Sequence, residues 1–434
     1  MNPKLVAEFP MQPTKITATI VAALAVVLMS APNLSAADKE RVLHTFKGTD
    51  GGAPDAGVIF DDAGNLYGTV QGGSGNHLFG AVFELLPDGN GKWTEKVLHT
   101  FNGKDGWQPI GGLIRDTTGN LYGTTSLGGT RGDGGDGTVF ELTPAANGKW
   151  TEKVLHNFGG ADGYYPMTNL IFDTTGNLYG TTQTGGTSTA CPNGCGVVFE
   201  LSPAAHGHWT EKVLHDFGKG EDGRNPYGLI FDATGNLYGT TYFGGAKNSG
   251  TVFELLPGNN GKWTEKVLHS FGLGTDGSNP QASLIFGASG NLYGTTLNGG
   301  IHGYGAVIEL MPQTNGQWTD KVLHSFNNDG KDGRYPQGVL IFDGTGNLYG
   351  TTPYGGSGTG CTAQFGLCGT VFELMPEANG KWTEKVLHSF VGNGSDGVGP
   401  YAGLIFDPAG NLYSTTFAGG AGLGLYGTVF EIIP

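Results

Sequence analysis

The chain has 434 residues, with 23 Lys and Arg against 38 Asp and Glu, which gives a formal net charge of −15. A surface of this sign repels phosphate backbones, so nucleic acid is excluded as an expected partner. Glycine contributes 81 residues without a three-residue period, which excludes a collagen-like chain and is typical of an all-β protein with many tight turns.

Residues 1–37 are predicted to be a signal peptide. Lys4 and Lys15 precede an apolar run at 16–29. The small residues Ser35, Ala36 and Ala37 come after this run and fit cleavage after Ala37. The alternative is a retained membrane anchor, although the run is shorter than the ~20 residues that a span needs. No later segment is expected to cross a membrane. We therefore expect a secreted, periplasmic or cell-surface protein.

Residues 38–434 contain one block repeated seven times, and its most constant piece is Gly-Asn-Leu-Tyr. Its seven asparagines follow one another at intervals of 55 to 64 residues and are Asn65, Asn120, Asn177, Asn236, Asn291, Asn347 and Asn411. A period in this range, built from short β-like runs, is typical of propeller blades. A residue that every block contains cannot mark a single active site.

Each block contains four strand-like runs, which in the fourth copy are 228–232, 236–241, 250–255 and 263–271. β-branched and aromatic residues fill these runs, while Gly, Pro, Asn and Asp separate them. No segment after residue 37 has a sustained helical period. The pattern predicts an all-β fold, a seven-bladed β-propeller of four-stranded antiparallel blades. The expected blades are 54–101, 110–158, 167–217, 227–271, 281–326, 337–390 and 401–434.

The two ends of the repeat region predict how the ring closes. The motif Val-Leu-His-x-Phe first occurs at 42–46 with no preceding strands, while the last blade has three strands and lacks its fourth. Residues 40–46 are therefore expected to supply the outer strand of the last blade, which protects a sheet edge.

The succession Gly-Asn-Leu-Tyr-Gly-Thr-Thr, Gly-Gly and Gly-Thr-Val-Phe-Glu-Leu resembles the GloVer tandem repeat of secreted bacterial proteins, over residues 40–434. The resemblance implies a propeller-like fold, frequent attachment to the cell surface through C-terminal anchors, and no established biochemical activity. Because the chain stops at Ile432-Ile433-Pro434 without a sorting tail, covalent attachment is not expected here.

Four cysteines occur as two local pairs, one in each of the two longest loops. Cys191 with Cys195 and Cys361 with Cys368 are expected to form loop-closing disulfides in an oxidising compartment. A four-thiolate zinc site would need two blades that a propeller keeps apart.

Connection lengths predict which face of the propeller carries function. The turns between strands one and two and between strands three and four are constant, whereas the other two connections vary in length. Connections alternate between the two ends of an antiparallel blade, so both variable loops share one face, which we call the variable face. Loops that vary on a rigid scaffold commonly carry binding residues.

Residues repeated in all blades are expected to be structural. These are the seven histidines of Val-Leu-His and the seven aspartates of Asp-Gly-x-x-Pro, whose carboxylate can cap its own turn. No metal site and no cofactor are expected, with calcium at the oxygen-rich loops as the alternative.

Candidate ligand-binding residues are those on the variable face that differ between blades. Aromatic rings beside Arg donors suit a flat, hydroxyl-rich ligand, and packing between blades is the alternative role. The candidates are Trp107, Tyr164, Tyr165, Arg224, Tyr242, Arg334, Tyr335 and Tyr354.

The sequence thus favours an exported, non-catalytic, monomeric propeller that binds an extracellular glycan or protein on its variable face. A propeller enzyme acting on polysaccharide or a small ester, as a hydrolase or lyase, is the first alternative, with no catalytic residues that the sequence singles out. A structural repeat protein of the cell envelope is the second.

Overall fold

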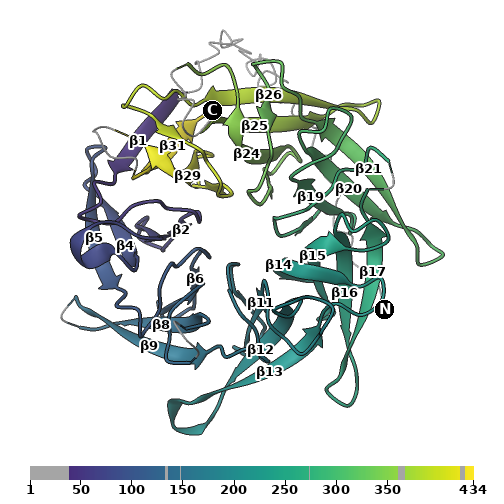
Figure 1. Cartoon of the computed structure of the whole chain (residues 1–434). Coiled ribbons are helices and arrows are strands. Elements are labelled where there is room, and N and C mark those ends of the chain that lie inside the picture. Colours follow the sequence, from purple (N-terminus) through teal and green to yellow (C-terminus); the bar gives the residue numbers. More distant parts are fainter. Residues whose placement is uncertain (1–38, 132–134, 147, 273, 360–366, 421–425) are drawn as a thin grey trace, which may run out of the picture. The chain divides into compact units, whose positions relative to one another are not determined.

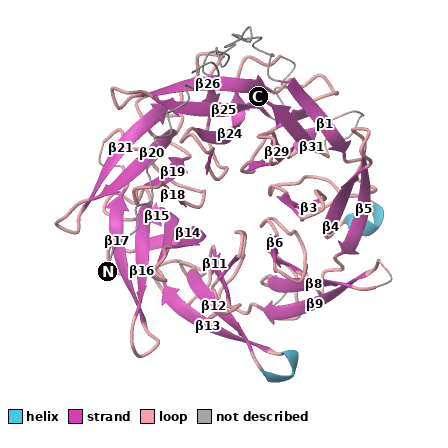
Figure 2. Ribbon diagram, turned by 180° about the vertical axis from the view of Figure 1, so that it is seen from behind, coloured by secondary structure: helices cyan, strands magenta, loops and turns pink. Residues whose placement is uncertain are grey.

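The computed structural model describes residues 39–131, 135–146, 148–272, 274–359, 367–420 and 426–434. The chain divides into two compact units, Met1–Ala37 and Asp38–Pro434. The first unit lies outside the described residues. The second is built almost entirely of strands and loops, with two short 3-10 turns, η1 (Gly75–His77) and η2 (Ala205–Gly207), as Figure 2 shows.

The second unit forms the predicted seven-bladed propeller, with seven antiparallel sheets arranged around a centre (Figure 1). Blade 1 contains β2 (Ile59–Phe60), β3 (Leu66–Val70), β4 (Ala81–Pro87) and β5 (Trp93–Thr100). Blade 2 contains β6 (Ile114–Arg115), β7 (Leu121–Thr125), β8 (Thr138–Pro144) and β9 (Trp150–Asn157). Blade 3 contains β10 (Ile171–Phe172), β11 (Leu178–Thr182), β12 (Val197–Pro203) and β13 (Trp209–Asp216). Blade 4 contains β14 (Gly223–Phe231), β15 (Leu237–Gly244), β16 (Thr251–Pro257) and β17 (Trp263–Ser270). Blade 5 contains β18 (Ile285–Phe286), β19 (Leu292–Thr296), β20 (Ala306–Pro312) and β21 (Trp318–Ser325). Blade 6 contains β22 (Gly333–Arg334), β23 (Ile341–Phe342), β24 (Leu348–Gly355), β25 (Leu367–Pro376) and β26 (Trp382–Ser389). Blade 7 contains β28 (Ile405–Phe406), β29 (Leu412–Thr416), β31 (Thr428–Ile433) and β1 (Lys39–Thr45), beside the small pair β27 (Gly397–Val398) and β30 (Ala418–Gly419).

The N-terminal strand closes the ring, which confirms the prediction. β1 pairs antiparallel with β31, so the sheet order of the last blade is β1-β31-β29-β28. Lys39 lies opposite Ile433 and Thr45 lies opposite Thr428. The two ends of the repeat region are thus held together by main-chain hydrogen bonds, and the last blade has no unpaired outer edge at β31.

The Val-Leu-His motif of every outer strand contains a β-bulge. In blade 3, Phe199 lies opposite Val213 and Val198 lies opposite His215, so Leu214 is the extra residue. The bulge turns this leucine into the core between neighbouring blades, where it is buried beside Phe217. The hydrophobic core is therefore a series of clusters, each shared by two adjacent blades.

The glycine after Leu-Tyr has a packing role in that core. A Cβ atom added to Gly123 would lie 2.6 Å from the ring of Phe140 on the paired strand. Phe140 in turn meets Phe101 of the preceding blade edge to face, with 5.1 Å between ring centroids. The absent side chain at Gly123 leaves room for the aromatic ring that joins the two blades.

The turn of constant length is held by a network of repeated side chains. In blade 1, Oδ1 of Asp61 accepts hydrogen bonds from the backbone of Ala63 and Asn65, each of 2.9 Å. The Tyr67 hydroxyl donates to Glu84 at 2.8 Å, and the ammonium of Lys96 donates to the other oxygen of that carboxylate at 3.1 Å. These repeated residues form the scaffold at this turn.

Candidate functional site

The Asp-Gly-x-x-Pro loops form the entrance to each blade on the variable face. The second residue after the glycine has a left-handed backbone in all seven blades, with φ of 53° at Ala53 and 59° at Tyr335. Its N–H donates a hydrogen bond to the preceding blade, as from Tyr335 to the Tyr304 carbonyl at 2.8 Å. Six of the seven are not glycine, so this inter-blade bond offsets a backbone conformation that is costly for such residues.

The aspartate of each of these loops meets the histidine of the preceding outer strand. The Nε2–Oδ2 distance ranges from 3.0 Å for His269 and Asp276 to 3.4 Å for His44 and Asp50. Backbone N–H groups of the loop also donate to the aspartate, as Gly159 does to Asp162 at 2.7 Å. The seven histidines lie one per blade and do not converge on one another, as the repeat predicts.

A cavity of about 250 Å³ lies at the centre and is lined by all seven blades. Each blade contributes the residue that directly follows its loop proline. In chain order these seven residues are Asp55, Ile110, Met167, Tyr227, Gln281, Gln337 and Tyr401. The position behind them holds small residues, among them Ala56, Gly228 and Ala402, which leave the space open.

Asp55 is the one carboxylate among the described residues that line this cavity. Burial raises its pKa from 3.8 to about 6, while the hydrogen bond that Gln71 donates at 2.9 Å acts in the opposite direction. The Tyr227 hydroxyl accepts hydrogen bonds from Gln183 at 2.9 Å and Gln281 at 3.3 Å. Burial raises the Tyr227 pKa to about 12, so its hydroxyl stays protonated at neutral pH. The cavity wall therefore offers both donors and acceptors.

A row of aromatic rings runs from the loops of blade 5 to the cavity wall. The centroids of Tyr304 and Tyr335 are 5.7 Å apart, as are those of Tyr335 and Tyr354. Tyr354 then meets Tyr401 at 6.4 Å, with 3.3 Å between their hydroxyl oxygens, and Tyr401 meets Phe417 at 5.6 Å. We call these five residues the aromatic row. It joins two predicted site residues, Tyr335 and Tyr354, to the cavity.

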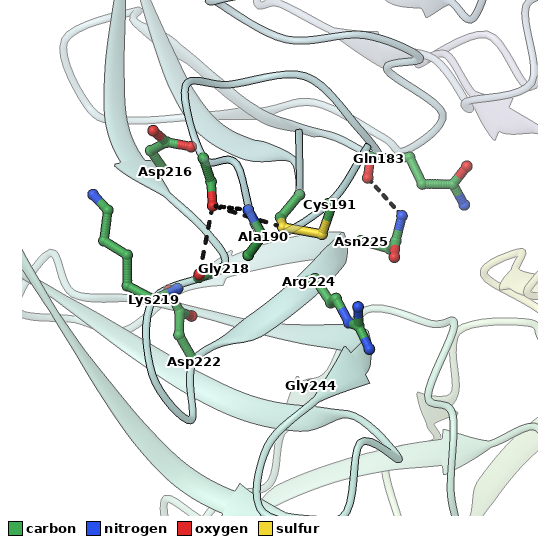
Figure 3. The surroundings of a disulfide bond; sticks show 12 residues. Gln183, Ala190, Cys191, Asp216, Gly218, Lys219, Asp222, Arg224, Asn225 and Gly244 are labelled. Atoms are coloured by element: carbon green, nitrogen blue, oxygen red, sulfur yellow. Dashed lines mark hydrogen bonds between the residues drawn. A yellow bond between two sulfur atoms is a disulfide. The ribbon is translucent and has the colours of Figure 1, made fainter. Parts of the chain in front are cut away.

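Arg224 lies in a second hollow of about 350 Å³ beside the first disulfide (Figure 3). Its guanidinium stands 5.6 Å from the ring centroid of Phe243 and donates a hydrogen bond to Asn248. Tyr242 packs against Phe243 at 4.5 Å and against Tyr227 at 6.3 Å, so it links this hollow to the wall of the central cavity.

The disulfide between Cys191 and Cys195 is confirmed, and its Cα atoms are 5.3 Å apart. Cys191 lines the same hollow as Arg224, so the cross-link shapes one wall of it. Cys361 lies outside the described residues, and its pairing with Cys368 stays a prediction.

Trp107, Tyr164 and Tyr165 lie apart from the aromatic row, whereas Arg334 directly precedes Tyr335 and pairs through its backbone with Tyr354. Trp107 meets Phe79 edge to face at 5.7 Å. Tyr164 and Tyr165 pack on one another at 6.4 Å, and 41% of Tyr165 is exposed. Arg334 donates a hydrogen bond to Asn328 at 3.0 Å. A ligand role for all eight candidates stays a prediction.

The seven cavity-lining residues are not among the residues predicted from the sequence, because those predictions rest on the two residues before each loop proline. The sequence does contain a pattern that indicates these residues. The residue after the proline is acidic in one blade, apolar in another and aromatic in a third, as Asp55, Met167 and Tyr401 show. A position that varies within an otherwise constant motif is a candidate for function by the same logic that selected the loops.

Among the described residues, no helix is long and apolar enough to cross a membrane. No curated protein matches the chain. The extracellular domain of a protein from B. thetaiotaomicron, BT4673, described as a one-component system, matches with a TM-score of 0.53 and 12% identity over 91% of this chain. This chain spans 40% of the length of that match. A gluconolactonase from Xanthomonas campestris, XC5397, matches with a TM-score of 0.41 and 15% identity over 72% of this chain and 85% of its own.

The model of the Gloeobacter/Verrucomicrobia repeat matches four overlapping segments, residues 33–210, 80–286, 187–364 and 259–434. Together the four segments extend over the whole propeller, which confirms the resemblance drawn from the repeat motifs. The chain belongs to the Gloeobacter/Verrucomicrobia repeat family.

Proposed function

We propose that this protein is an exported, non-catalytic propeller that binds an extracellular glycan at the mouth of its central cavity. The observation that carries the proposal is the aromatic row, which leads from Tyr304 on the variable face to Tyr401 in the cavity wall. Ring faces pack on the apolar faces of sugars, while hydroxyl, amide and carboxylate groups bind sugar hydroxyls.

The polar groups of the cavity suit a ligand rich in hydroxyls. Asp55 and the glutamine side chains supply acceptors and donors, and the tyrosine hydroxyls supply both. Export is supported by the disulfide between Cys191 and Cys195, because such bonds persist in oxidising compartments.

One observation favours the alternative of a propeller hydrolase or lyase. Asp55 has a pKa raised to about 6, which is suited to a general acid or base near neutral pH. A carboxylate-pair glycosidase needs a second carboxylate at roughly 5–10 Å, and the described lining of the cavity holds Asp55 alone.

A glycan array followed by calorimetry on residues 38–434 tests the proposal, with product release followed in the same samples with and without EDTA. Tyr354→Ala removes the central ring of the aromatic row and is expected to weaken binding about tenfold, or about 1.4 kcal/mol. Tyr165→Ala is the matched variant, because Tyr165 is an exposed tyrosine outside the row.

Each result distinguishes the candidate functions. Loss of affinity in Tyr354→Ala but not in Tyr165→Ala supports the aromatic row as the site. Loss in Tyr165→Ala alone would place the ligand elsewhere on the variable face and overturn this assignment. Release of cleaved sugar would replace the binding function with an enzyme, and absence of any bound glycan would favour a protein partner or an envelope role.

A further inference from the structure

Three clusters of one histidine, one aspartate and one glutamate lie at interfaces between neighbouring blades. In each cluster one nitrogen and two carboxylate oxygens lie within 4.8 Å of one another. The clusters are His99, Asp105 and Glu152; His324, Asp332 and Glu384; and His388, Asp396 and Glu40. None of these residues lines the central cavity.

The fold assembles each cluster from two blades. His99 lies on β5, the outer strand of blade 1, and Asp105 follows it in the loop that leads to blade 2. Glu152 lies on β9, the outer strand of blade 2. Because the glutamate comes from the next blade, its distance along the sequence from the histidine hides the cluster in the one-dimensional pattern.

The distances between histidine and aspartate suit two ligands of a common ion. Nε2 and Oδ2 are 3.3 Å apart in the first cluster, 3.2 Å in the second and 3.1 Å in the third. Two atoms each bound at about 2.0–2.2 Å to one Zn²⁺ are separated by roughly 3.0–3.5 Å. The observed separations fall inside that interval.

Buried polar atoms in the clusters lack hydrogen-bond partners among the described residues. They are Oδ1 of Asp332 and of Asp396, and Oε1 of Glu40, Glu152 and Glu384; the same oxygen is also unpaired in Glu95, Glu211 and Glu265, outside the clusters. Asp332 is 4% exposed and Asp396 is 5% exposed, so water reaches these carboxylates poorly. Buried polar groups in native proteins are almost always satisfied, so each of these atoms needs a proton or a cation as partner. The three clusters differ from the other blades in that their nitrogen and carboxylate oxygens lie close enough together to share one ion.

The charges of each cluster indicate what that partner is. Two carboxylates that face one another in a buried place repel unless a cation or a proton compensates. Two carboxylates and a neutral imidazole balance the charge of a divalent ion, and a nitrogen donor favours a transition metal over calcium.

We propose that each of the three clusters binds a divalent transition-metal ion of the Zn²⁺ class. The ligands are Nε2 of the histidine and one oxygen each of the aspartate and the glutamate, with water completing the coordination. The ion connects two adjacent blades at their outer strands. In the cluster that contains Glu40, it connects the ring-closing strand β1 to blade 6.

At two of the four equivalent positions outside the clusters, a specific feature prevents such a site. In blade 3, the guanidinium of Arg131 already lies 3.2 Å from the carboxylate of Asp162, which is the aspartate that faces Glu211. In blade 5, the glutamate position of the outer strand is the exposed and shorter Asp320. These blades supply natural controls of matching chemistry.

The test measures zinc bound to the untagged full chain after treatment with EDTA, dialysis against Zn²⁺ and elemental analysis. We expect the triple variant Glu40→Gln, Glu152→Gln and Glu384→Gln to bind three fewer zinc ions per chain than the wild type, one for each cluster. Glu211→Gln makes the same chemical change outside the clusters and is expected to keep the wild-type stoichiometry. Zinc is also expected to raise the thermal midpoint of the wild type and not that of the triple variant.

Zinc that binds exposed histidines such as His206 and His208 forms a background common to all variants. Equal zinc content in the triple variant and the wild type would overturn the proposal. So would a wild type that retains no zinc, because a proton shared between the carboxylates would then be the missing partner. Far-UV circular dichroism of each variant establishes that the propeller is folded when its zinc is counted.

Discussion

Replacing Asp55 with asparagine is expected to change how the stability of the propeller depends on pH. The substitution keeps the shape of the side chain and an oxygen that accepts the hydrogen bond from Gln71. It removes the ionisable carboxyl group, so residue 55 no longer binds or releases a proton as the pH changes. The difference between the variant and the wild type therefore isolates the ionisation of one cavity-lining group.

The sign and size of the effect follow from the raised pKa of Asp55. Between its ordinary value of 3.8 and its folded value of about 6, the unfolded chain has released a proton that the folded protein still holds. The contribution of Asp55 to the free energy of unfolding is therefore fully present below pH 3.8, falls as the pH rises, and is lost above about pH 6. The full difference corresponds to about 3 kcal/mol. Because Asp55 is partly exposed to the cavity, we expect about 1–3 kcal/mol.

Thermal unfolding of the wild type and Asp55→Asn between about pH 3 and pH 8 measures this effect. An unfolding entropy of about 2.1 cal/mol/K per residue over about 400 residues makes 1 kcal/mol equal to about 1.2 °C. The midpoint of Asp55→Asn minus that of the wild type should therefore grow by about 1–4 °C as the pH rises, and then stay constant.

Asp88→Asn is a control of opposite sign, because backbone hydrogen bonds from Asn90 and Lys92 lower the pKa of Asp88. That variant should lose stability relative to the wild type as the pH rises through the ordinary range of a carboxyl group. A midpoint difference for Asp55→Asn that does not change between pH 4 and 7 would refute the assignment of Asp55 as a buried carboxyl with a raised pKa.

Three further substitutions test the scaffold. Phe46→Ala should lower the free energy of unfolding by about 3–5 kcal/mol in denaturant titrations, because Phe46 is fully buried where the closing strand meets blade 1; a loss below about 1 kcal/mol would contradict its role in closure. Gly123→Ala should cost about 1–3 kcal/mol by forcing its methyl group against a buried phenylalanine ring, whereas Gly344→Ala, with nothing within 4 Å, is the neutral control that must differ from it. Cys195→Ser should cost about 2 kcal/mol, since the bond to Cys191 closes a short loop; the thermal midpoint with and without reductant measures this, and an unchanged midpoint would show that the bond does not stabilise the fold.

The architecture could be predicted because a propeller is periodic. Six of the seven blocks repeat the same turn chemistry, with Gly287 in place of the aspartate in the fifth. Asp61, Asn65 and Tyr67 of the first block therefore signal the hairpin that the other blades form. The unpaired first copy of Val-Leu-His-x-Phe and the missing last strand indicated the closure through β1. The bulge at Leu214 was not predicted, because one extra residue in a strand leaves no break in an apolar pattern.

The candidate site could be predicted only in part. The sequence predicts Tyr335 and Tyr354 as aromatic residues on the variable face, and the structure places them side by side in the aromatic row. Their continuation through Tyr401 depends on which side chains of blades 6 and 7 face one another. Sequence spacing does not contain that information, because the contact joins residues 47 positions apart.

The repeat, the class of fold, the number of blades and the face on which loops differ all follow from the sequence alone. These properties are local, since each block carries its own turns and its own alternation of apolar residues. Other contacts depend on the folded ring: Asp55 shares a cavity with Tyr227 and Tyr401, and His99 and Asp105 meet Glu152 of the next blade. Those contacts arise when the ring closes and brings distant blocks together, so no single block specifies them.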